Sequence, residues 1–582
     1  MGASSASLFK DGDLLFAIEE ERLSRIKNDG GFPILAIQEC LNHASISIDD
    51  IEAVCVYWKP LKITTRIRGV LSKLLSLDTF SISIIQTTLH SLFSKENKLY
   101  PELRGRWLDL FFIRSIIKKN FKRYNGKIYF FDHHLTHQYY AEAIDNYCKS
   151  ISLSFDGGGE EDSTVLSINE NNKKKIIKKI KWPNSMGHYY SYFTGFLGFR
   201  MLEGEYKMMG LAPLGTPKYK KEIYDNIISF DEKNGIYNFN FRLCDYHSAL
   251  KGRFNKKIIK IFGNPRKSND PVTQVHMDIA ASVQIVFEEI LIDLLKFIKK
   301  SDFNSENLVL SGGCALNVTA NGKIIEKKMF SNVTLPPAPH DGGCSIGAVL
   351  AHLKINKNIS INYESIKNPY LGSSFTSNEM LQVFKEKNLS IPNFYNDEDL
   401  TDIVAKKLSN QEIIAWFQGR SEFGPRALGS RSFLADPRND EIREEINRKI
   451  KKRELFRPFA PSVIFEKQNE FFEMDKFSPY MNIVSKVKEN KKNIIPAVVH
   501  TDGTSRVHSV KKDYNSLYYL LLSKFYQKTG VPILLNTSFN IQEPIVNSPA
   551  DAIRTFFNSD VDTLVLGNYL CDLNWKKKQK YE

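Results

Sequence analysis

Apolar strands that run directly into glycine turns set the fold class of this chain. Ser150–Phe155 and Leu308–Leu310 have the pattern of buried strands, and each ends at a run of glycines. Helical stretches separate such strands, for example the run from Met277 to Lys299. Alternating strands and helices predict an α/β protein, in which ligands bind at the carboxyl ends of the strands.

Length and composition fit more than one folded domain. The chain has 582 residues, of which 42% are hydrophobic and 25% are charged, and such a chain forms about two to four domains with ordinary cores. Between residues 354 and 396 the pattern loosens into Asn, Ser, Lys and Pro. We therefore expect one domain over residues 1–355 and a second α/β domain over residues 356–582.

Most of the net charge of +14 is concentrated in one segment. Residues 59–127 contain 15 Lys or Arg and 4 Asp or Glu. A nucleic-acid or membrane surface would use such charge, but the interleaved aromatic and basic residues typical of base stacking are missing. We favour a basic helical insertion whose apolar faces pack and whose basic faces are solvated.

Nothing in the sequence predicts a membrane span or an export signal. The chain has no run of 18 apolar residues, and its first residues lack the basic-then-apolar layout of a signal peptide. Its seven cysteines form no Cys-x-x-Cys pair, which is typical of a protein with reduced thiols. We expect a cytoplasmic protein with no membrane partner.

Two histidines four residues apart are the first candidate metal ligands. On a helix, the spacing of His133 and His137 puts both imidazoles on one face. Asp156 and Asp341 each precede glycines, so they are either metal ligands or turn residues. Two imidazoles and two carboxylates suit Fe²⁺, Mn²⁺ or Zn²⁺, and His134 is placed to orient a ligand.

The glycines at the two strand ends are candidate anion sites. In residues 156–160 and 311–313, backbone N–H groups can approach an anion closely because glycine has no side chain. A tight structural turn explains either loop alone equally well. Two such loops beside acids resemble the split nucleotide site of actin-like ATPases. Lys207 either meets a phosphate there or is a solvated lysine.

Arginines concentrate in the C-terminal part of the chain, in apolar and glycine- or proline-rich strings that should be buried. A buried guanidinium group needs an anion, and its planar fork suits phosphate or carboxylate. Pairing with Glu422 or Glu454 would explain a single arginine but not the whole group. The group comprises Arg420, Arg426, Arg431, Arg438, Arg453, Arg457 and Arg506, with Lys451 among them.

Motifs along nearly the whole chain resemble those of the O-carbamoyltransferases that modify nodulation factors and antibiotics. The matching strings are Glu19–Lys27, Asp132–His137, Phe155–Glu160, Glu205–Gly215, Leu308–Asn317, Asp341–Gly343, Trp416–Arg438, Arg453–Val463 and Leu534–Val546. The resemblance implies an actin-like (ASKHA, tRNA threonylcarbamoyl-transferase-type) N-terminal domain and a YrdC-like C-terminal domain. The second domain would make carbamoyl-adenylate from carbamoyl phosphate and ATP. The first would transfer the carbamoyl group to a hydroxyl.

In the first domain, the resemblance assigns roles to the candidate metal ligands and to both glycine loops. His133, His137, Asp156 and Asp341 would hold the metal, with Fe²⁺ expected. Lys27 and His137 would be catalytic, Lys27 at the phosphate of the adenylate. The adenylate pocket would comprise Gly157, Gly158, Lys207, Ser311, Gly312, Gly313 and Asn317.

In the second domain, the resemblance makes Lys451 catalytic and implies Mg²⁺ with the ATP. The residues expected to bind carbamoyl phosphate and ATP are Arg426, Arg431, Lys451, Met481, Arg506 and Ser538.

One position departs from the family pattern. The family opens with a first strand and a His-Asp pair before Ser-Ser-Ala, whereas Gly2 and Ala3 stand here directly after Met1. We therefore expect a missing first strand and a missing histidine near the acceptor, through truncation or a misassigned start.

Rival functions stay open. Threonylcarbamoyl transfer to tRNA would use the basic segment as an RNA surface, an actin-like sugar kinase would need no buried arginines, and a basic binding protein would need no catalysis. The arginine group favours a carbamoyltransferase with ATP, carbamoyl phosphate and a hydroxylated small molecule as partners, such as a sugar, an antibiotic or a nodulation-factor-like compound. We expect no nucleic-acid partner, and a homodimer is left open.

Overall fold

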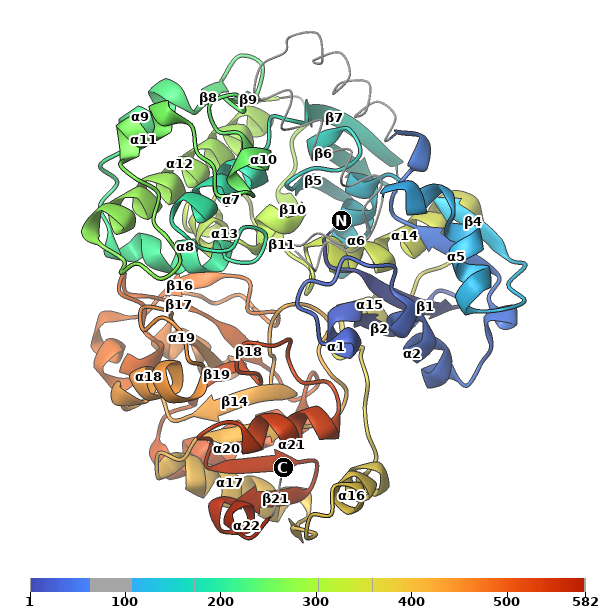
Figure 1. Ribbon diagram of the computed structural model, residues 1–582, viewed down its shortest axis with the longest axis vertical. Coiled ribbons are helices and arrows are strands. Elements are labelled where there is room, and N and C mark those ends of the chain that lie inside the picture. The colour runs from blue at the N-terminus through green and yellow to red at the C-terminus, as the bar shows by residue number, and fades with distance from the viewer. Residues whose placement is uncertain (1, 63–106, 172, 302, 358, 580–582) are drawn as a thin grey trace. The chain divides into compact units, whose positions relative to one another are not determined.

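The computed structural model describes residues 2–62, 107–171, 173–301, 303–357 and 359–579 (Figure 1). They form two compact units, one of residues 1–20 with 28–367 and one of residues 21–27 with 368–582. Both units mix helices and strands, so the predicted α/β class is confirmed.

We expected the second domain to begin at residue 356. The second unit resumes only at residue 368, because the residues in between pack on the first unit. The helix α15 (Tyr363–Lys367) lies against α6 (His133–Asp145) and β2 (Asp13–Glu19). In addition, Ser365 Oγ accepts a hydrogen bond of 3.0 Å from the Leu14 amide.

The main sheet of the first unit has the strand order β11-β10-β5-β6-β7. Its strands are β5 (Lys149–Phe155), β6 (Asp162–Glu170), β7 (Lys173–Lys181), β10 (Asn307–Ser311) and β11 (Asn332–Thr334). The first three are antiparallel neighbours, and β10 and β11 add in parallel on the other side of β5. Three antiparallel strands followed by two parallel ones is the order that an actin-like domain requires.

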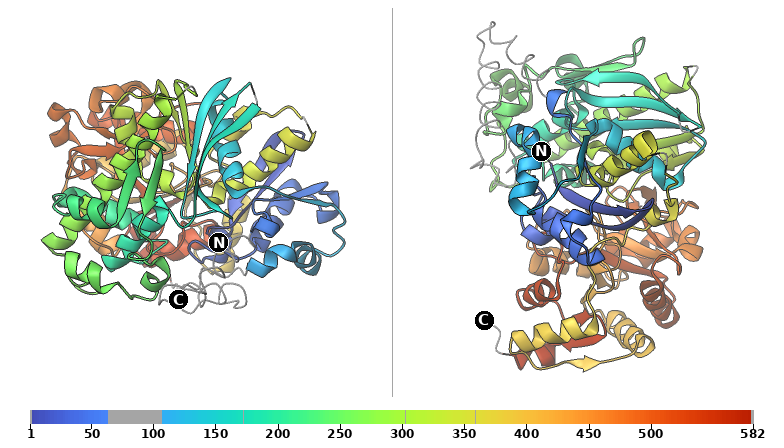
Figure 2. Two further views of the ribbon diagram at one scale, coloured as in Figure 1. Left: turned by 90° about the horizontal axis from the view of Figure 1, so that it is seen from above. Right: turned by 90° about the vertical axis from the view of Figure 1, so that its right-hand side faces the viewer.

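Successive side chains of β5 point to opposite faces of the sheet, and each face is covered by a different helix. The Ser154 hydroxyl meets the His134 ring on α6 at 2.8 Å, and Ser152 bonds Glu142 of the same helix. On the opposite face, Phe155 stacks on Phe287 of α12 (Gln274–Lys299). Because successive side chains of a strand point to opposite faces, α6 takes the serine face and α12 the apolar face. Figure 2 shows helices on both sides of these strands.

Smaller elements complete the first unit. Near the N-terminus, β1 (Ser5–Lys10) and β2 form an antiparallel pair, and β3 (Ala53–Val56) pairs in parallel with β4 (Lys127–Phe130).

Most of the predicted basic insertion, residues 63–106, lies outside the described residues. The described remainder includes α5 (Ile113–Asn120), which buries Ile113 and Ile117 and exposes its lysines, as the favoured interpretation requires.

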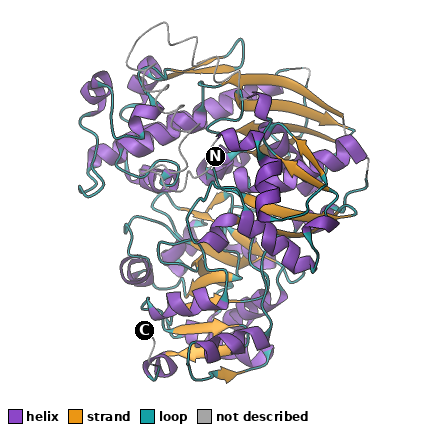
Figure 3. Ribbon diagram, turned by 45° about the vertical axis from the view of Figure 1, so that its right-hand side comes forward, coloured by secondary structure: helices purple, strands orange, loops and turns teal. Residues whose placement is uncertain are grey.

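The second unit is built on an eight-stranded mixed sheet in the order β12-β21-β20-β13-β14-β19-β15-β18. Its strands are β12 (Asn393–Phe394), β13 (Ile414–Phe417), β14 (Arg431–Ala435), β15 (Ala460–Ile464), β18 (His508–Val510), β19 (Ile533–Ser538), β20 (Thr563–Leu566) and β21 (Tyr569–Asp572). The helix α20 (Ser516–Thr529) packs on β15 and β19, and α21 (Pro549–Phe557) packs on β13 and β20. Figure 3 shows strands flanked by helices in both units. No described helix is long and apolar enough to span a membrane.

Candidate functional site

The four predicted metal ligands come together in the first unit. His133 and His137 lie on the first two turns of α6, Asp156 directly follows β5, and Asp341 begins a short turn before α14 (Cys344–His352). Asp156 Oδ2 lies 3.5 Å from His133 Nε2 and 3.2 Å from His137 Nε2. Asp341 Oδ1 lies 3.7 and 3.6 Å from the same two nitrogens. One candidate ligand atom from each residue falls within 4.8 Å of all the others.

Opposite charges hold this cluster in the protein interior. Burial opposes protonation of His133, but the carboxylates of Asp341 and Asp156 outweigh it and raise its pKa to about 10. Burial likewise opposes ionisation of Asp156, yet its hydrogen bonds to both imidazoles hold its pKa well below the ordinary value.

The residues of this cluster fit a divalent metal. Asp156 Oδ2 is buried and faces the Nε2 atoms of both imidazoles. Imidazole and carboxylate are ligands of Fe²⁺, Mn²⁺ and Zn²⁺. Cys344, which the motifs did not single out, has its sulfur in a second group with His133 and His137 within the same 4.8 Å. The signal was present, because Cys344 directly follows the Asp341-Gly-Gly turn.

Two further carboxylates fix the start of α6. Both oxygens of Glu160, which is buried, accept hydrogen bonds of 3.2 Å from the His133 amide. Asp132, the residue before the helix, pairs with Lys59 at 2.8 Å and with Lys62. Carboxylates near a helix N-terminus are stabilising. The sequence did not single out Glu160 for this role.

His134 supports the site from the sheet side. Its ring nitrogens bond Ser154 Oγ at 2.8 Å and the Asp162 carbonyl at 2.9 Å. Burial, followed by the charges of His133 and His137, lowers its pKa to about 3. A neutral ring held in this way fixes the first turn of α6 against β5.

The two glycine loops meet at the carboxyl ends of β5 and β10. Gly312 has a φ of +90°, and a side chain there would meet the Phe155 carbonyl at 2.1 Å. A side chain at Gly313 would meet Asp156 Oδ1 at 3.0 Å. Glycine is therefore required where the second loop passes the metal cluster. The Ser311 hydroxyl is buried beside this loop and has no hydrogen-bond partner among the described residues.

The other residues that were predicted to line the adenylate pocket differ in how close they lie to these two loops. The Gly157 amide bonds Asp156 Oδ1 at 2.6 Å, and Gly158 follows it with a φ of +157°. Asn317 exchanges two hydrogen bonds of 3.0 Å with Gln284 of α12. Lys207, on α8 (Glu205–Leu211), lies 5.9 Å from the centre of the Phe199 ring. Its contact with a phosphate stays a prediction.

The position where the family pattern has a histidine lies at the metal cluster. A Cβ atom added to Gly2 would come within 2.9 Å of Asp341 Oδ2. A histidine at this position would therefore stand beside the candidate metal ligands.

In the second unit, four arginines and a lysine crowd together. Burial lowers the pKa of Arg506 well below its ordinary value, and the positive charges of Arg426, Arg453 and Arg457 lower it further. Burial also lowers the pKa of Lys451, which feels the charges of Arg453 and Arg457 as well. We call these five residues the cationic cluster. Three of the residues predicted to bind carbamoyl phosphate and ATP, Arg426, Lys451 and Arg506, belong to it.

Lys451 is held by the loop that follows β19. Its Nζ donates to the Ser538 carbonyl, to Ser538 Oγ at 3.2 Å, and to the carbonyl and Oδ1 of Asn540 at 2.8 Å each. Lys451 and Ser538 were both predicted site residues, and the structure brings them into contact. Asn540 was missed, although it lies in one of the matching motifs.

Arg431 lies apart from this crowd and is bound to the backbone. It is fully buried, and its two terminal nitrogens donate to the carbonyls of Gln418, Ser430, Ser373 and Gly419 at 2.6 to 3.1 Å. Burial lowers its pKa to about 9. These contacts indicate a structural role, and ligand binding by Arg431 stays an untested prediction.

Two other arginines of the predicted group also have protein partners. Arg420 donates to the carbonyls of Leu371 and Gly372, and Arg438 pairs with the buried Asp436 at 2.6 Å. Three of the seven arginines thus lie outside the cationic cluster. Within the cluster, Arg453 also donates to Asn447 Oδ1 at 2.6 Å, and Arg457 lies 3.9 Å from a carboxylate oxygen of Glu454.

Met481 and Glu422 shape the loop between β13 and β14. Met481 is buried against Leu428 and has a φ of +55°, which is uncommon for a residue other than glycine. Glu422 Oε1 accepts hydrogen bonds from the amides of Leu428, Ser430 and Arg431 at 2.7 to 3.0 Å. From the sequence, we expected Glu422 only as a partner for arginine side chains.

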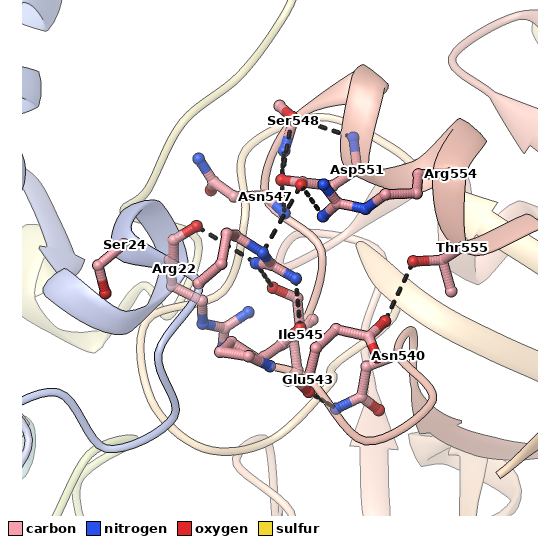
Figure 4. Close-up of polar contacts among 12 residues, drawn as sticks. Arg22, Ser24, Asn540, Glu543, Ile545, Asn547, Ser548, Asp551, Arg554 and Thr555 are labelled. Carbon is pink, nitrogen blue, oxygen red and sulfur yellow. Dashed lines mark hydrogen bonds and ion pairs between the residues drawn. The ribbon is translucent and has the colours of Figure 1, made fainter. Parts of the chain in front are cut away.

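Residues 21–27, which we call the strap, belong to the second unit. Arg22 donates to the Gly424 carbonyl at 2.7 Å, and Arg25 donates to the carbonyls of Ile545 at 2.8 Å and Pro544 at 2.6 Å. Figure 4 shows Arg22 and Ser24 of the strap, together with the segment that contains Asn540, Glu543 and Ile545.

Lys27 is the last residue of the strap. We expected it at the adenylate phosphate of the first domain. The structure groups it with the second unit, because Arg22 and Arg25 hold the strap there, and its place at a phosphate stays a prediction. Its charge contributes to the lowered pKa of Lys451.

Comparisons with known proteins match nearly the whole chain. The family model described as carbamoyltransferase N-terminus matches residues 2–350, and the one described as carbamoyltransferase C-terminus matches residues 405–572. An uncharacterized protein of Synechocystis sp. is 36% identical over 97% of this chain and 94% of its own length. Nodulation protein NolNO of Sinorhizobium fredii is 34% identical over 98% and 79%, and nodulation protein NolO of Bradyrhizobium diazoefficiens is 36% identical over 75% and 78%. This chain therefore belongs to the carbamoyltransferase family, as its motifs predicted.

Proposed function

We propose that this chain is an ATP-dependent O-carbamoyltransferase that works in two steps. In the second unit, carbamoyl phosphate, ATP and water would give carbamoyl-adenylate, pyrophosphate and phosphate. In the first unit, the carbamoyl group would pass from the adenylate to a hydroxyl of a small molecule, with release of AMP and a proton.

The cationic cluster is the observation that carries the first step. Burial, and after it the repulsion between like charges in the protein interior, lowers the pKa values of Arg506 and Lys451. A phosphate-bearing ligand in their midst would offset this repulsion. Charge that is fixed in advance stabilises a transferring phosphoryl group and its leaving pyrophosphate.

Lys451 is the member placed most firmly. Its ammonium group is oriented by Ser538 and Asn540, so little reorganisation is needed when a ligand arrives. The entering negative charge would raise its depressed pKa and favour the charged form. We assign Lys451 to a phosphate or carbamoyl oxygen of the activation step.

The first unit supplies the transfer site. His133, His137, Asp156 and Asp341 would hold a divalent metal, which when bound polarises a carbonyl oxygen as a Lewis acid. The amides of the Gly157 and Gly313 loops can approach the phosphate of the adenylate, because no side chains obstruct them. Glu160 and His134 keep α6 in register so that both imidazoles face Asp156.

A coupled assay tests the proposal. The purified protein should release pyrophosphate from ATP only when carbamoyl phosphate is present. With a suitable hydroxylated acceptor, label from carbamoyl phosphate should appear in the product. Release of pyrophosphate that does not depend on carbamoyl phosphate would contradict the proposed activation step.

A further inference from the structure

A recess in the first unit is lined by aromatic side chains, and we call it the aromatic recess. His188 lies on α7 (Met186–Phe196) and Tyr246 begins α10 (Tyr246–Ala249), and these two helices pack against each other (Figure 1). The two steps of the proposed function use none of the rings that line it. These rings belong to Trp182, His188, Phe239, Phe241, Tyr246 and His247.

The rings of the aromatic recess form a wall and not a closed core. His188 and Tyr246 stack with their ring centres 3.9 Å apart and their planes 15° apart, and Trp182 meets His188 edge-on at 6.4 Å. All three side chains are only half-buried, so part of each ring stays open to a ligand. Aromatic side chains arranged in this way are typical of surfaces on which the ring of a small molecule packs.

The first turn of α7 fixes this wall against the loop that contains Asp156. The Ser185 hydroxyl lies 3.0 Å from the Asp156 carbonyl and 2.9 Å from the Gly157 carbonyl, and it accepts a hydrogen bond of 3.0 Å from the His188 amide. A side chain at Gly187 would come within 2.6 Å of the Gly157 nitrogen, so helix and loop touch through their backbones. A Cβ atom on Gly157 would lie 3.5 Å from the His188 ring. The aromatic recess therefore begins one residue away from a candidate metal ligand.

The lining of the aromatic recess indicates what class of ligand it can hold. Among the described residues, neither a lysine nor an arginine lines it, so a phosphate group would find no opposite charge there. Aromatic rings pack well against the C–H face of a sugar ring, and a few polar side chains then bind its hydroxyls. Asp245 and His247 supply such polar groups in the lining. This combination suits a hydroxylated ring and not a nucleotide.

We propose that the aromatic recess binds a sugar ring of the acceptor, packed against Trp182 and Tyr246. This rests on the proposed function and narrows its acceptor from any hydroxylated small molecule to a glycoside or another cyclic sugar. The ring is held beside Gly157, so that one of its hydroxyls reaches the transfer site. Trp182 and Tyr246 are therefore residues that determine acceptor specificity.

Saturation-transfer difference NMR of the full-length protein tests the aromatic recess without ATP, carbamoyl phosphate or a known acceptor. The probes are the methyl glycosides of glucose and of N-acetylglucosamine. Glucitol is the matched probe, because it has the hydroxyls of glucose but no ring. We expect saturation of the ring C–H protons of the glycosides and at least about fivefold less saturation of glucitol.

Variants assign the binding to the wall of rings. Trp182→Ala and Tyr246→Ala should each weaken binding of the glycosides at least about fivefold, because a stacked ring is lost. Phe112→Ala is the matched control, since Phe112 is an exposed aromatic side chain of the first unit that does not line the recess. It should bind the glycosides within about twofold of the wild type. Circular dichroism checks that each variant is folded.

Two results would overturn sugar binding and leave the proposed function standing. One is that the glycosides are saturated no more than glucitol in the wild-type protein. The other is that glycoside binding survives unchanged in both folded variants of the recess.

The coupled assay then tests whether the bound sugar is the acceptor. A glycoside that binds should receive label from carbamoyl phosphate, with a KM at least about fivefold higher in Tyr246→Ala. Binding without transfer, in protein whose pyrophosphate release depends on carbamoyl phosphate, would overturn the acceptor role alone. Pyrophosphate release without that dependence would instead contradict the proposed function and, with it, the acceptor role, while the NMR result for sugar binding would stand.

Discussion

Arg431 is buried and Arg506 is partly buried, and different groups surround them. Arg431 donates to four carbonyls, whereas Arg506 lies among other cations. Arg431→Ala would leave buried carbonyls without donors and should lower the free energy of unfolding by about 3 to 5 kcal/mol. Arg506→Ala removes a like-charge repulsion, so its melting temperature should stay the same or rise. Thermal unfolding of both variants measures this difference.

The activity of the same two variants should show the opposite order. We expect Arg506→Ala to raise the KM for carbamoyl phosphate or ATP at least about tenfold, because a desolvated charge–phosphate contact is lost. A fully stable Arg431→Ala with the same KM defect would show that Arg431 binds the ligand after all, as its motif first predicted.

A buried histidine gives the second unit a pH-dependent stability. The His508 Nδ1 forms a hydrogen bond of 2.7 Å with Ser462 Oγ. This oxygen also accepts a hydrogen bond from the side-chain amide of Asn536, which donates in addition to the carbonyl of Ala427, next to Arg426. Burial lowers the pKa of His508 to about 3 from 6.5. The folded ring stays neutral while the unfolded one takes up a proton below pH 6.5. Stability from this residue is therefore complete above that pH and declines as the pH falls.

The expected size of this effect between pH 7 and pH 5 is about 2 kcal/mol. Urea unfolding at both pH values should show a smaller loss for His508→Gln than for the wild type, since glutamine does not titrate. Equal losses in the two proteins would mean that His508 does not contribute.

For single residues, the sequence predicted which kinds of side chain form a site better than it predicted the role of each one. The spacing of His133 and His137 and the acid before each glycine pair were sufficient to locate the metal cluster, because helix and strand periodicity determine which side chains meet. The arginines were predicted as a group. Which of them meet carbonyls and which meet each other depends on loop packing, and local patterns do not contain that information.

Among the elements, the strap has the most specific function. Arg25 donates a hydrogen bond to the carbonyl of Ile545, which lies 520 positions further along the chain. The adjoining Glu543 carbonyl accepts from Asn540, and Asn540 holds Lys451. We infer that Arg25 is a positioning residue for Lys451. Arg25→Ala should lower the rate of pyrophosphate release about ten- to a hundredfold, mainly in kcat, while Arg25→Lys recovers part of it.

Arg554→Ala is the matched control for the strap. Arg554 pairs with Asp551 at 2.6 Å, the same carboxylate that Arg25 approaches at 3.6 Å, but its side chain is 49% exposed. Exposed pairs contribute little, so this variant should keep its rate within about twofold. Equal effects of the two substitutions would mean that Asp551, and not the loop, is what Arg25 serves.

The elements also show where prediction from sequence ends. The strands β5 and β10 were located because apolar runs end there in glycine turns. The strap was read as part of the first domain because neighbouring residues in sequence usually share a domain. Only the long-range contacts of Arg22 and Arg25 assign it to the second unit, and these contacts cannot be predicted from the periodicity of the sequence.

At the scale of the whole molecule, the chain enters the second unit twice. Residues 21–27 belong to it, the chain then builds the first unit, and it returns at residue 368. A cut near residue 367 would therefore remove the strap from the unit that it supports. The proposed steps should be separated by point substitutions in the intact chain and not by expressing the units alone.

Two substitutions make this separation. Lys451→Met keeps much of the side-chain volume but loses the ammonium group, so pyrophosphate release and carbamoyl transfer should both fall at least about a hundredfold. His137→Ala removes a candidate metal ligand from the first unit, so it should spare pyrophosphate release and abolish transfer to the acceptor. Carbamoyl-adenylate supplied from outside should restore transfer in Lys451→Met and not in His137→Ala. The reverse pattern of rescue would show that the transfer site, and not the activation site, depends on Lys451, and would refute the division of labour between the two units.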